Sequence, residues 1–209
     1  MFNLDVLAVV LAFVVGITVH EFAHGWTADR LGDPTARYAG RLTLNPVAHA
    51  DPVGTILLPI LLIATGSRFI FGWAKPVPIN PYHFRDRRRG LVLVSVAGPL
   101  ANVVTAVLAA VLLGFSGFTS PVLADIFITI IWINIILAVF NLIPVPPLDG
   151  SKILAGLLPG RQEWLIRFEQ YGMIILVLLV FSGALGVLFR YIVDPAAKLL
   201  IFLATGVRF

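Results

Sequence analysis

Long apolar runs alternate with shorter polar stretches along this chain. Four of these runs, at residues 4–27, 91–115, 122–143 and 172–193, are 22 to 25 residues long. An α-helix rises about 1.5 Å per residue, so each run is long enough to cross a hydrocarbon core of about 30 Å. The pattern therefore predicts four membrane-spanning helices.

Two shorter apolar runs predict less regular elements. Residues 53–65 form a 13-residue run that contains Pro59, which is short for a full span and favours a re-entrant segment. Residues 196–207 are also apolar, and we expect a last helix there, whose length leaves open whether it spans the membrane.

Two further stretches have the character of extended backbone. Arg41–Leu44 lies in the turn-rich segment 28–52, and the prolines of Phe69–Ile79 favour extended structure. The predicted fold is thus an α-helical integral membrane protein. We expect a bundle of about 4–6 transmembrane helices with a re-entrant segment and short β-strand or hairpin elements near the functional site.

Composition supports a membrane-embedded chain. Hydrophobic residues make up 59% of the 209 residues and charged residues 12%, whereas soluble domains have about 45–50% and about 25%. We therefore interpret residues 1–209 as a single membrane domain, with no room for a soluble domain of ordinary size. The absence of cysteine excludes disulfides, thiolate metal ligands and cysteine nucleophiles.

The sequence HEFAH at residues 20–24 places three ionisable groups at the end of the first apolar run. Helix positions i and i+4 share a face, so His20 and His24 can reach one tetrahedral ion, and this spacing is the zinc metalloprotease signature. Glu21 can take a proton from a metal-bound water. Lone histidines in membranes also form hydrogen bonds between helices, but three ionisable groups within one helical turn are costly there and indicate a functional site.

A catalytic zinc normally has three protein ligands, and Asp149 is the best candidate for the third. It lies in NLIPVPPLDG, residues 141–150, directly after an apolar run. Prolines end the helix there and leave backbone groups that lipid cannot satisfy, so the stretch should line a cavity or pack on protein. Taken alone, Asp149 also fits a helix N-cap.

Three motifs together resemble those of the site-2 protease family of intramembrane zinc metalloproteases: HEFAH, AGPLAN at residues 97–102 and NLIPVPPLDG. The similarity covers a catalytic core of roughly residues 8–155, with C-terminal helices at 172–207. The segments NPVAHADPVGT at 45–55 and GWAKPVPINP at 72–81 resemble the short bacterial branch that lacks PDZ and CBS domains.

The resemblance implies that His20, His24 and Asp149 bind one zinc ion (Zn2+). It also implies that Glu21 is the general base and then the proton donor to the leaving amine. Asn141 matches the asparagine that stabilises the oxyanion in the family, while interhelical hydrogen bonding remains its alternative role. Asn102 matches the polar position of the middle motif, where it either lines the site or is structural.

The implied function is intramembrane cleavage of the transmembrane segments of other membrane proteins, as in regulated intramembrane proteolysis. The expected partners are such substrates and the lipid bilayer, with no nucleic acid. One alternative is a membrane metal carrier or sensor, which would need polar residues along a path that runs 91–115 and 172–193 almost lack. A catalytically inactive relative is the other, and the intact Glu21 argues against it. A His₂Asp ligand set also fits divalent ions other than zinc.

Charge distribution predicts the orientation. Lysines and arginines gather in the polar stretches around residues 28–52, 66–90 and 144–171, whereas the 116–121 loop has none. The positive-inside rule places the charged stretches in the cytoplasm. We therefore expect a multi-pass protein of a bacterial cell membrane, with its site inside the bilayer nearer the cytoplasmic face.

Overall fold

The computed structural model describes residues 4–57, 61, 64–65, 73–116, 120–158 and 163–206. These residues contain helices and loops but no β-strand. Three helices are long and apolar enough to cross a membrane: α1 (Leu4–Arg30), α5 (Arg87–Ser116) and α6 (Pro121–Asn141). They confirm three of the predicted spans, each within a few residues of its expected bounds.

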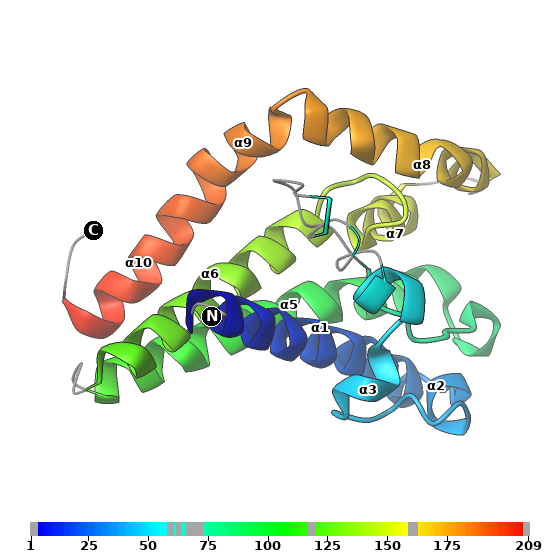
Figure 1. Cartoon of the computed structure of the whole chain (residues 1–209). Helices are drawn as coiled ribbons and strands as arrows, with labels where there is room; N and C mark the ends of the chain where they lie inside the picture. The colour runs from blue at the N-terminus through cyan, green and yellow to red at the C-terminus, as the bar shows by residue number, and fades with distance from the viewer. Residues whose placement is uncertain are drawn as a thin grey trace.

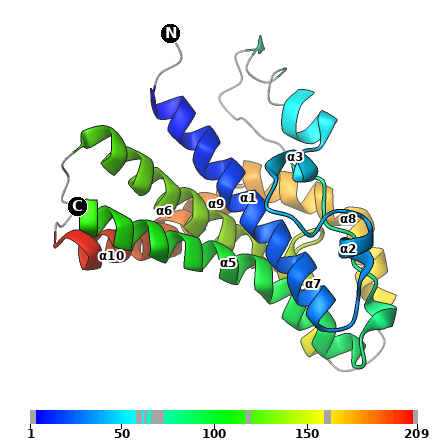
Figure 2. The ribbon, with the colours of Figure 1, turned by 90° about the horizontal axis from the view of Figure 1, so that it is seen from below.

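The three long helices pack on one another and form the framework of the molecule (Figures 1 and 2). Small side chains allow a close approach on one face of α5, where Ala106, Ala109 and Ala110 are buried against α6 and the C-terminal arm. The remaining buried members of this core are Leu113, Ala124, Ile131, Ile135, Val193, Ala197 and Ile201. Close contact of small residues is how helices associate in lipid, where hydrophobic burial gives little driving force.

Local capping explains where the long helices start. The Asp86 carboxylate accepts from the backbone N–H groups of Arg88 and Arg89 at 3.0 and 3.1 Å, at the beginning of α5. Ser120 caps α6, with Pro121 at the first helical position. Both arrangements satisfy N–H groups that a helix terminus leaves without a partner.

Short elements connect the framework helices. The loop after α1 carries α2 (Thr35–Tyr38), α3 (Pro46–His49) and the π-helical turn η1 (Pro52–Leu57). The 3-10 turn η2 (Pro81–His83) precedes α5. After α6 come α7 (Asp149–Leu157) and α8 (Glu163–Phe181). The expected re-entrant segment 53–65 lies partly outside the described residues and stays a prediction.

The predicted span at 172–193 is not one continuous helix, although the bent pair of helices there is together long and apolar enough to cross a membrane. α8 ends at Phe181, and the chain resumes as α9 (Ala184–Leu188), the π-helical turn η3 (Phe189–Val193) and α10 (Asp194–Thr205). The chain bends by 70° between the two apolar arms, Phe168–Phe181 and Ala184–Thr205, which form a wide inverted V in Figure 1. The cause is Gly183, whose φ of +76° is a left-handed conformation that stops a helix. The expected last helix at 196–207 is therefore the end of this second arm.

The strand predicted at Arg41–Leu44 is also absent, because residues 42–44 form bends. The neighbouring segment 74–80 contains Pro76 and Pro78, which cannot donate to a strand ladder. Instead, the Arg41 guanidinium donates to the carbonyl of Lys75 at 2.6 Å. Of the other expected strand, residues 73–79 are not in a sheet and 69–72 lie outside the described residues.

We expect Gly183→Ala to lower the free energy of unfolding, since a left-handed backbone costs a residue with a Cβ about 1–2 kcal/mol. Gly186→Ala is the matched control, because Gly186 lies in α9, its φ is not left-handed and a Cβ there would meet nothing within 4 Å. Denaturant titration in detergent measures both. Equal stability of Gly183→Ala and the unmodified chain would contradict this account of the bend.

Candidate metal centre

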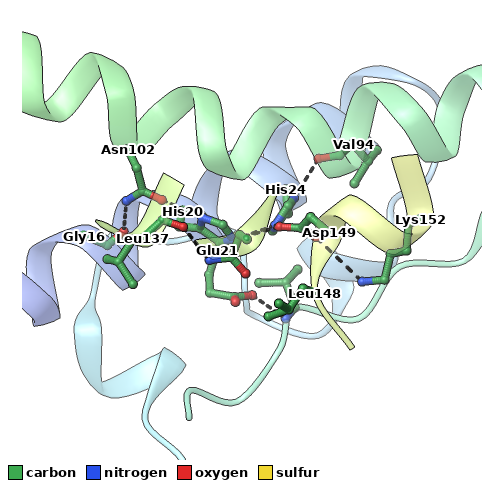
Figure 3. A network of polar contacts seen from close by, with 12 residues as sticks. Gly16, His20, Glu21, His24, Val94, Asn102, Leu137, Leu148, Asp149 and Lys152 are labelled. Carbon is green, nitrogen blue, oxygen red and sulfur yellow. Dashed lines mark hydrogen bonds and ion pairs between the residues drawn. The ribbon is translucent and has the colours of Figure 1, made fainter. Parts of the chain in front are cut away.

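The site forms where α1 and α7 meet, against α5. His20 and His24 are one turn apart on α1, and their Nε2 atoms lie 3.0 Å from each other. Asp149, the first residue of α7, places Oδ2 at 3.1 Å from His20 Nε2 and 3.2 Å from His24 Nε2 (Figure 3). All three side chains are buried.

This triangle of atoms fits a divalent metal ion. Tetrahedral zinc ligands at about 2.0–2.1 Å from the ion lie roughly 3.3 Å apart, and the three observed separations are 3.0 to 3.2 Å. The structure thus brings together the three residues that the sequence singled out as ligands, from positions 125 residues apart in the chain.

Hydrogen bonds on the far side of each imidazole set its tautomer. Nδ1 of His24 lies 2.7 Å from the carbonyl oxygen of Val94, which can only accept, so Nδ1 carries the proton. Nδ1 of His20 lies 2.7 Å from Oδ1 of Asn102, an oxygen that likewise accepts. Both Nε2 atoms then present lone pairs toward the centre of the site, as metal ligation requires.

The orientation of Asn102 is itself fixed by its neighbours. Its amide nitrogen donates to the carbonyl of Gly16 and to Oδ1 of Asn134, both at 2.9 Å. Asn134 donates in turn to the carbonyl of Ile130 at 2.9 Å. Asn102 and Asn134 are fully buried. Of the two roles that the sequence left open for Asn102, the geometry favours a structural one, behind His20, and Asn134 is a supporting residue that the sequence did not assign to the site.

A glycine lets α5 approach the two histidines. A Cβ on Gly98 would lie 2.5 Å from His24 Nε2 and 2.6 Å from His20 Cε1, closer than real Cβ contacts. The sequence AGPLAN therefore combines two functions on one helix face, since Gly98 makes room for the imidazoles and Asn102, one turn later, binds one of them.

Glu21 lies beside the triangle. Its Oε2 accepts from the backbone N–H of Val77 at 2.8 Å. Glu21, the three candidate ligands and Asn141 line one cavity of about 300 Å³, whose other lining residues are Pro76, Val77, Ile79, Pro81, Leu91, Val94, Ser95, Pro147 and Lys152. Ionisable and apolar side chains thus line the same cavity.

Asn141 is placed at the cavity but not yet turned toward a ligand. It is the last residue of α6, and its amide nitrogen donates to the carbonyl of Leu137 at 2.9 Å. This bond lies within its own helix, so it is not the interhelical hydrogen bond that was the alternative role for Asn141. A side-chain rotation is needed before the amide can bind an oxyanion.

Lys152 is a cation at the site that the sequence did not single out. Its Nζ lies 3.8 Å from Oδ1 of Asp149, the oxygen that faces away from the histidines. The sequence signal that could have indicated this pair is the i,i+3 spacing of Asp149 and Lys152 in DGSK, which places the two side chains on one helix face.

The other two histidines lie outside the site. His49 is buried, with Nε2 at 2.8 Å from the carbonyl of Thr43. His83 pairs through Nδ1 with the carboxylate of Asp33 at 2.8 Å. Neither lines the cavity.

Comparisons with known proteins agree with this geometry. The model of Peptidase family M50 matches residues 118–183. The chain is 41% identical over 179 residues to "Putative zinc metalloprotease YwhC" of Bacillus subtilis. This alignment covers 81% of this chain and 78% of the relative. It is 35% identical over 185 residues to "Putative zinc metalloprotease Rip2" of Mycolicibacterium smegmatis, and this alignment covers 86% of this chain and 69% of the relative. No solved structure matches.

The chain therefore belongs to peptidase family M50, the site-2 protease family of membrane-embedded metalloproteases. The family assignment and the relatives' names identify it as a hydrolase of the metalloprotease class.

We expect Gly98→Ala to weaken metal binding about 10- to 100-fold, because the added methyl displaces both imidazoles from their supporting hydrogen bonds. Gly114→Ala is the control on the same helix: its Cβ would meet the carbonyl of Ala204 at 2.5 Å, far along α5 from the histidines. Competition with a zinc chelator measures both affinities. Unchanged affinity in Gly98→Ala would show that the histidines do not depend on this close approach.

Proposed function

We propose that this protein is an intramembrane zinc endopeptidase that cuts transmembrane segments of other membrane proteins. The observation that carries the proposal is the convergence of His20, His24 and Asp149 within 3.2 Å, with Glu21 in the same cavity. Two of the three ligands lie on a helix long and apolar enough to span a membrane.

The proposed roles follow from where each group lies. His20 and His24 through Nε2, and Asp149 through Oδ2, would hold one zinc ion. Such an ion would supply Lewis-acid chemistry, which polarises a peptide carbonyl and lowers the pKa of water toward about 7. Glu21 takes the proton of the attacking water and later passes it to the leaving amine nitrogen. Asn141, after rotation, donates its amide N–H to the oxyanion that forms on the carbonyl.

The substrate class follows from the setting of the cavity. A transmembrane helix protects its amides by internal hydrogen bonds, so a substrate must unwind locally before cleavage. Pro76, Pro81 and Pro147 line the cavity, and a proline-rich wall of extended backbone suits an extended peptide. We keep the hypothesis that segment 73–79 pairs with the unwound substrate, while Arg41–Leu44 forms bends and is a weaker candidate.

The test of this function uses two variants that should differ in whether they retain zinc. Glu21→Gln should lower cleavage of a transmembrane peptide by about 10²–10⁴-fold or more while zinc is retained, because the carboxylate moves protons and is not a ligand. Asp149→Ala should lose the ion, because two imidazoles on one helix remain. Cleavage assays and metal analysis of the purified protein measure both effects.

Two acids that do not line the cavity provide the controls for this test. Glu169→Gln and Asp194→Ala remove carboxylates outside the cavity and should leave cleavage and zinc unchanged. Full cleavage by Glu21→Gln would remove its role as base, and a metal carrier would show no cleavage in any variant. Full zinc occupancy in Asp149→Ala would return Asp149 to the role of a helix cap.

For the topology, we propose that the site lies nearer the cytoplasmic face of a bacterial cell membrane. His24 near the end of α1 and Asp149 after α6 must meet, so both ends lie on one side. α5 and α6 form an out-and-back pair. The chain between α1 and α5 must therefore return to the side on which it starts, which supports re-entry of 53–65, and the arginines place that side in the cytoplasm.

Single cysteines test this orientation, because the natural chain has none. We expect Tyr38→Cys, whose parent side chain is 84% exposed, and Asp86→Cys to react only with a reagent added from the cytoplasmic side. Thr119→Cys should react only from the other side. Labelling of positions 38 and 86 from opposite sides would mean that segment 53–65 spans fully, and the proposed architecture would fall.

A further inference from the structure

The segment Trp73–His83, here called the strap, forms one wall of the cavity. It contributes Pro76, Val77, Ile79 and Pro81 to the lining, opposite the candidate metal ligands. Its three prolines limit the backbone to a narrow range of conformations and remove three N–H donors. In Pro76–Val77–Pro78 only Val77 keeps a backbone N–H, and that group binds the carboxylate of Glu21 at 2.8 Å. The strap therefore contacts the proposed general base through a single donor.

The C-terminal end of the strap is fastened by Asp33, which is fully buried in the turn after α1. Its Oδ2 accepts from the backbone N–H of Asn80 at 2.6 Å, and its Oδ1 lies 2.8 Å from Nδ1 of His83. The N–H of Thr35, at 3.1 Å, and the Thr35 hydroxyl also donate to Oδ1. One carboxylate thus joins the end of α1 to two separate points of the strap.

Asp33 is suited to this task as an anion. Burial opposes its ionisation, but hydrogen bonds from His83, Thr35 and Asn80 outweigh the burial and hold its pKa below the ordinary carboxyl value. Charge-assisted bonds to a buried carboxylate are stronger than bonds between neutral groups, so the connection is stiff.

The N-terminal end of the strap has its own contacts. The backbone N–H of Lys75 donates to the carbonyl of His49 at 3.0 Å. The half of the strap that reaches Glu21 therefore lies between a fastening at Lys75 and one at Asp33, and Val77 sits between them, itself buried.

We propose that Asp33 is a positioning residue for peptide cleavage: it holds the strap in register so that the Val77 N–H fixes the carboxylate of Glu21 beside the metal centre. This inference rests on the proposed function only in assigning the base to Glu21. The strap connection itself is a property of the fold and is measurable without catalysis.

The first experiment measures the strap directly. Val77→Cys keeps the backbone N–H and gives the chain one thiol at a position where the valine is 6% exposed. We expect a maleimide to label Val77→Cys slowly. Labelling should be at least about tenfold faster when Asp33→Asn is added, because the NH₂ group of asparagine would face the N–H and O–H donors that now bind the carboxylate and would release the strap. Asp29→Asn is the matched control, since Asp29 pairs with Arg37 and does not contact the strap.

A second variant covers the case in which Asp33→Asn fails to fold. His83→Ala removes one of the four donors to Asp33, and the His83 side chain is 46% exposed, so folding should survive. We expect a smaller increase in the labelling rate of Val77→Cys. An unchanged labelling rate in His83→Ala and in any folded Asp33→Asn protein overturns the proposal.

The second experiment links the strap to Glu21. Val77→Pro deletes the N–H in a stretch already flanked by prolines, whereas Val77→Ala keeps it. We expect kcat in Val77→Pro to be about 10- to 100-fold lower than in Val77→Ala, and kcat in Asp33→Asn to fall by a similar factor from that of the unmodified chain, with zinc content unchanged. Equal kcat in the proline and alanine variants would contradict the link to Glu21.

The two experiments separate this proposal from the proposed function. If neither the unmodified chain nor any variant cleaves a transmembrane peptide, the proposed function fails. The labelling rates then still decide whether Asp33 holds the strap. If the unmodified chain cleaves and Asp33→Asn changes neither kcat nor labelling, the positioning role fails while the endopeptidase function stands.

Discussion

Three lone-pair-bearing atoms held within 3.2 Å of one another are the constraint on which the rest of the structure depends. Two imidazole nitrogens and a carboxylate oxygen have no stable arrangement at that distance without a proton or a cation among them. In a low-dielectric interior their mutual repulsion is strong and water cannot screen it. The fold must therefore supply binding energy to keep the groups converged.

Hydrogen bonds one layer behind the candidate ligands hold them in this arrangement. Val94 and Asn102, both on α5, each accept from an Nδ1. Asn102 is in turn held by the backbone of α1 and by Asn134 of α6, so three spanning helices share one polar network. Such a network is costly unless every member has a partner, and each of these asparagines donates and accepts inside the protein. The polar residues that support the ligands thus also hold the bundle together.

The three candidate ligands that the structure brings together could be selected from the sequence because the constraint on each is local or compositional. HEFAH needs only helical geometry to put two imidazoles on one face, and Asp149 is conspicuous because acids are rare next to apolar runs. Asn134 could not be assigned in the same way, since its role depends on a contact between helices that the hydrophobic pattern does not specify. Lys152 pairs with Asp149 within α7, and only its i,i+3 spacing indicated the pair. The break at Gly183 was missed because the apolar pattern continues across it, and hydropathy does not respond to a single left-handed φ. The strand at Arg41–Leu44 was predicted from propensity, but prolines on the facing segment remove its partner.

The proline content of the strap has a consequence for the cost of order near the site. Fixing the backbone of an ordinary residue costs about 1–2 kcal/mol in conformational entropy. Pro76, Pro78 and Pro81 have little φ freedom to lose, and the residues before them are restricted as well. The wall that faces the substrate is therefore partly ordered before any of its contacts form. A few hydrogen bonds are enough to hold it, and releasing one of them does not return the full freedom of a flexible loop.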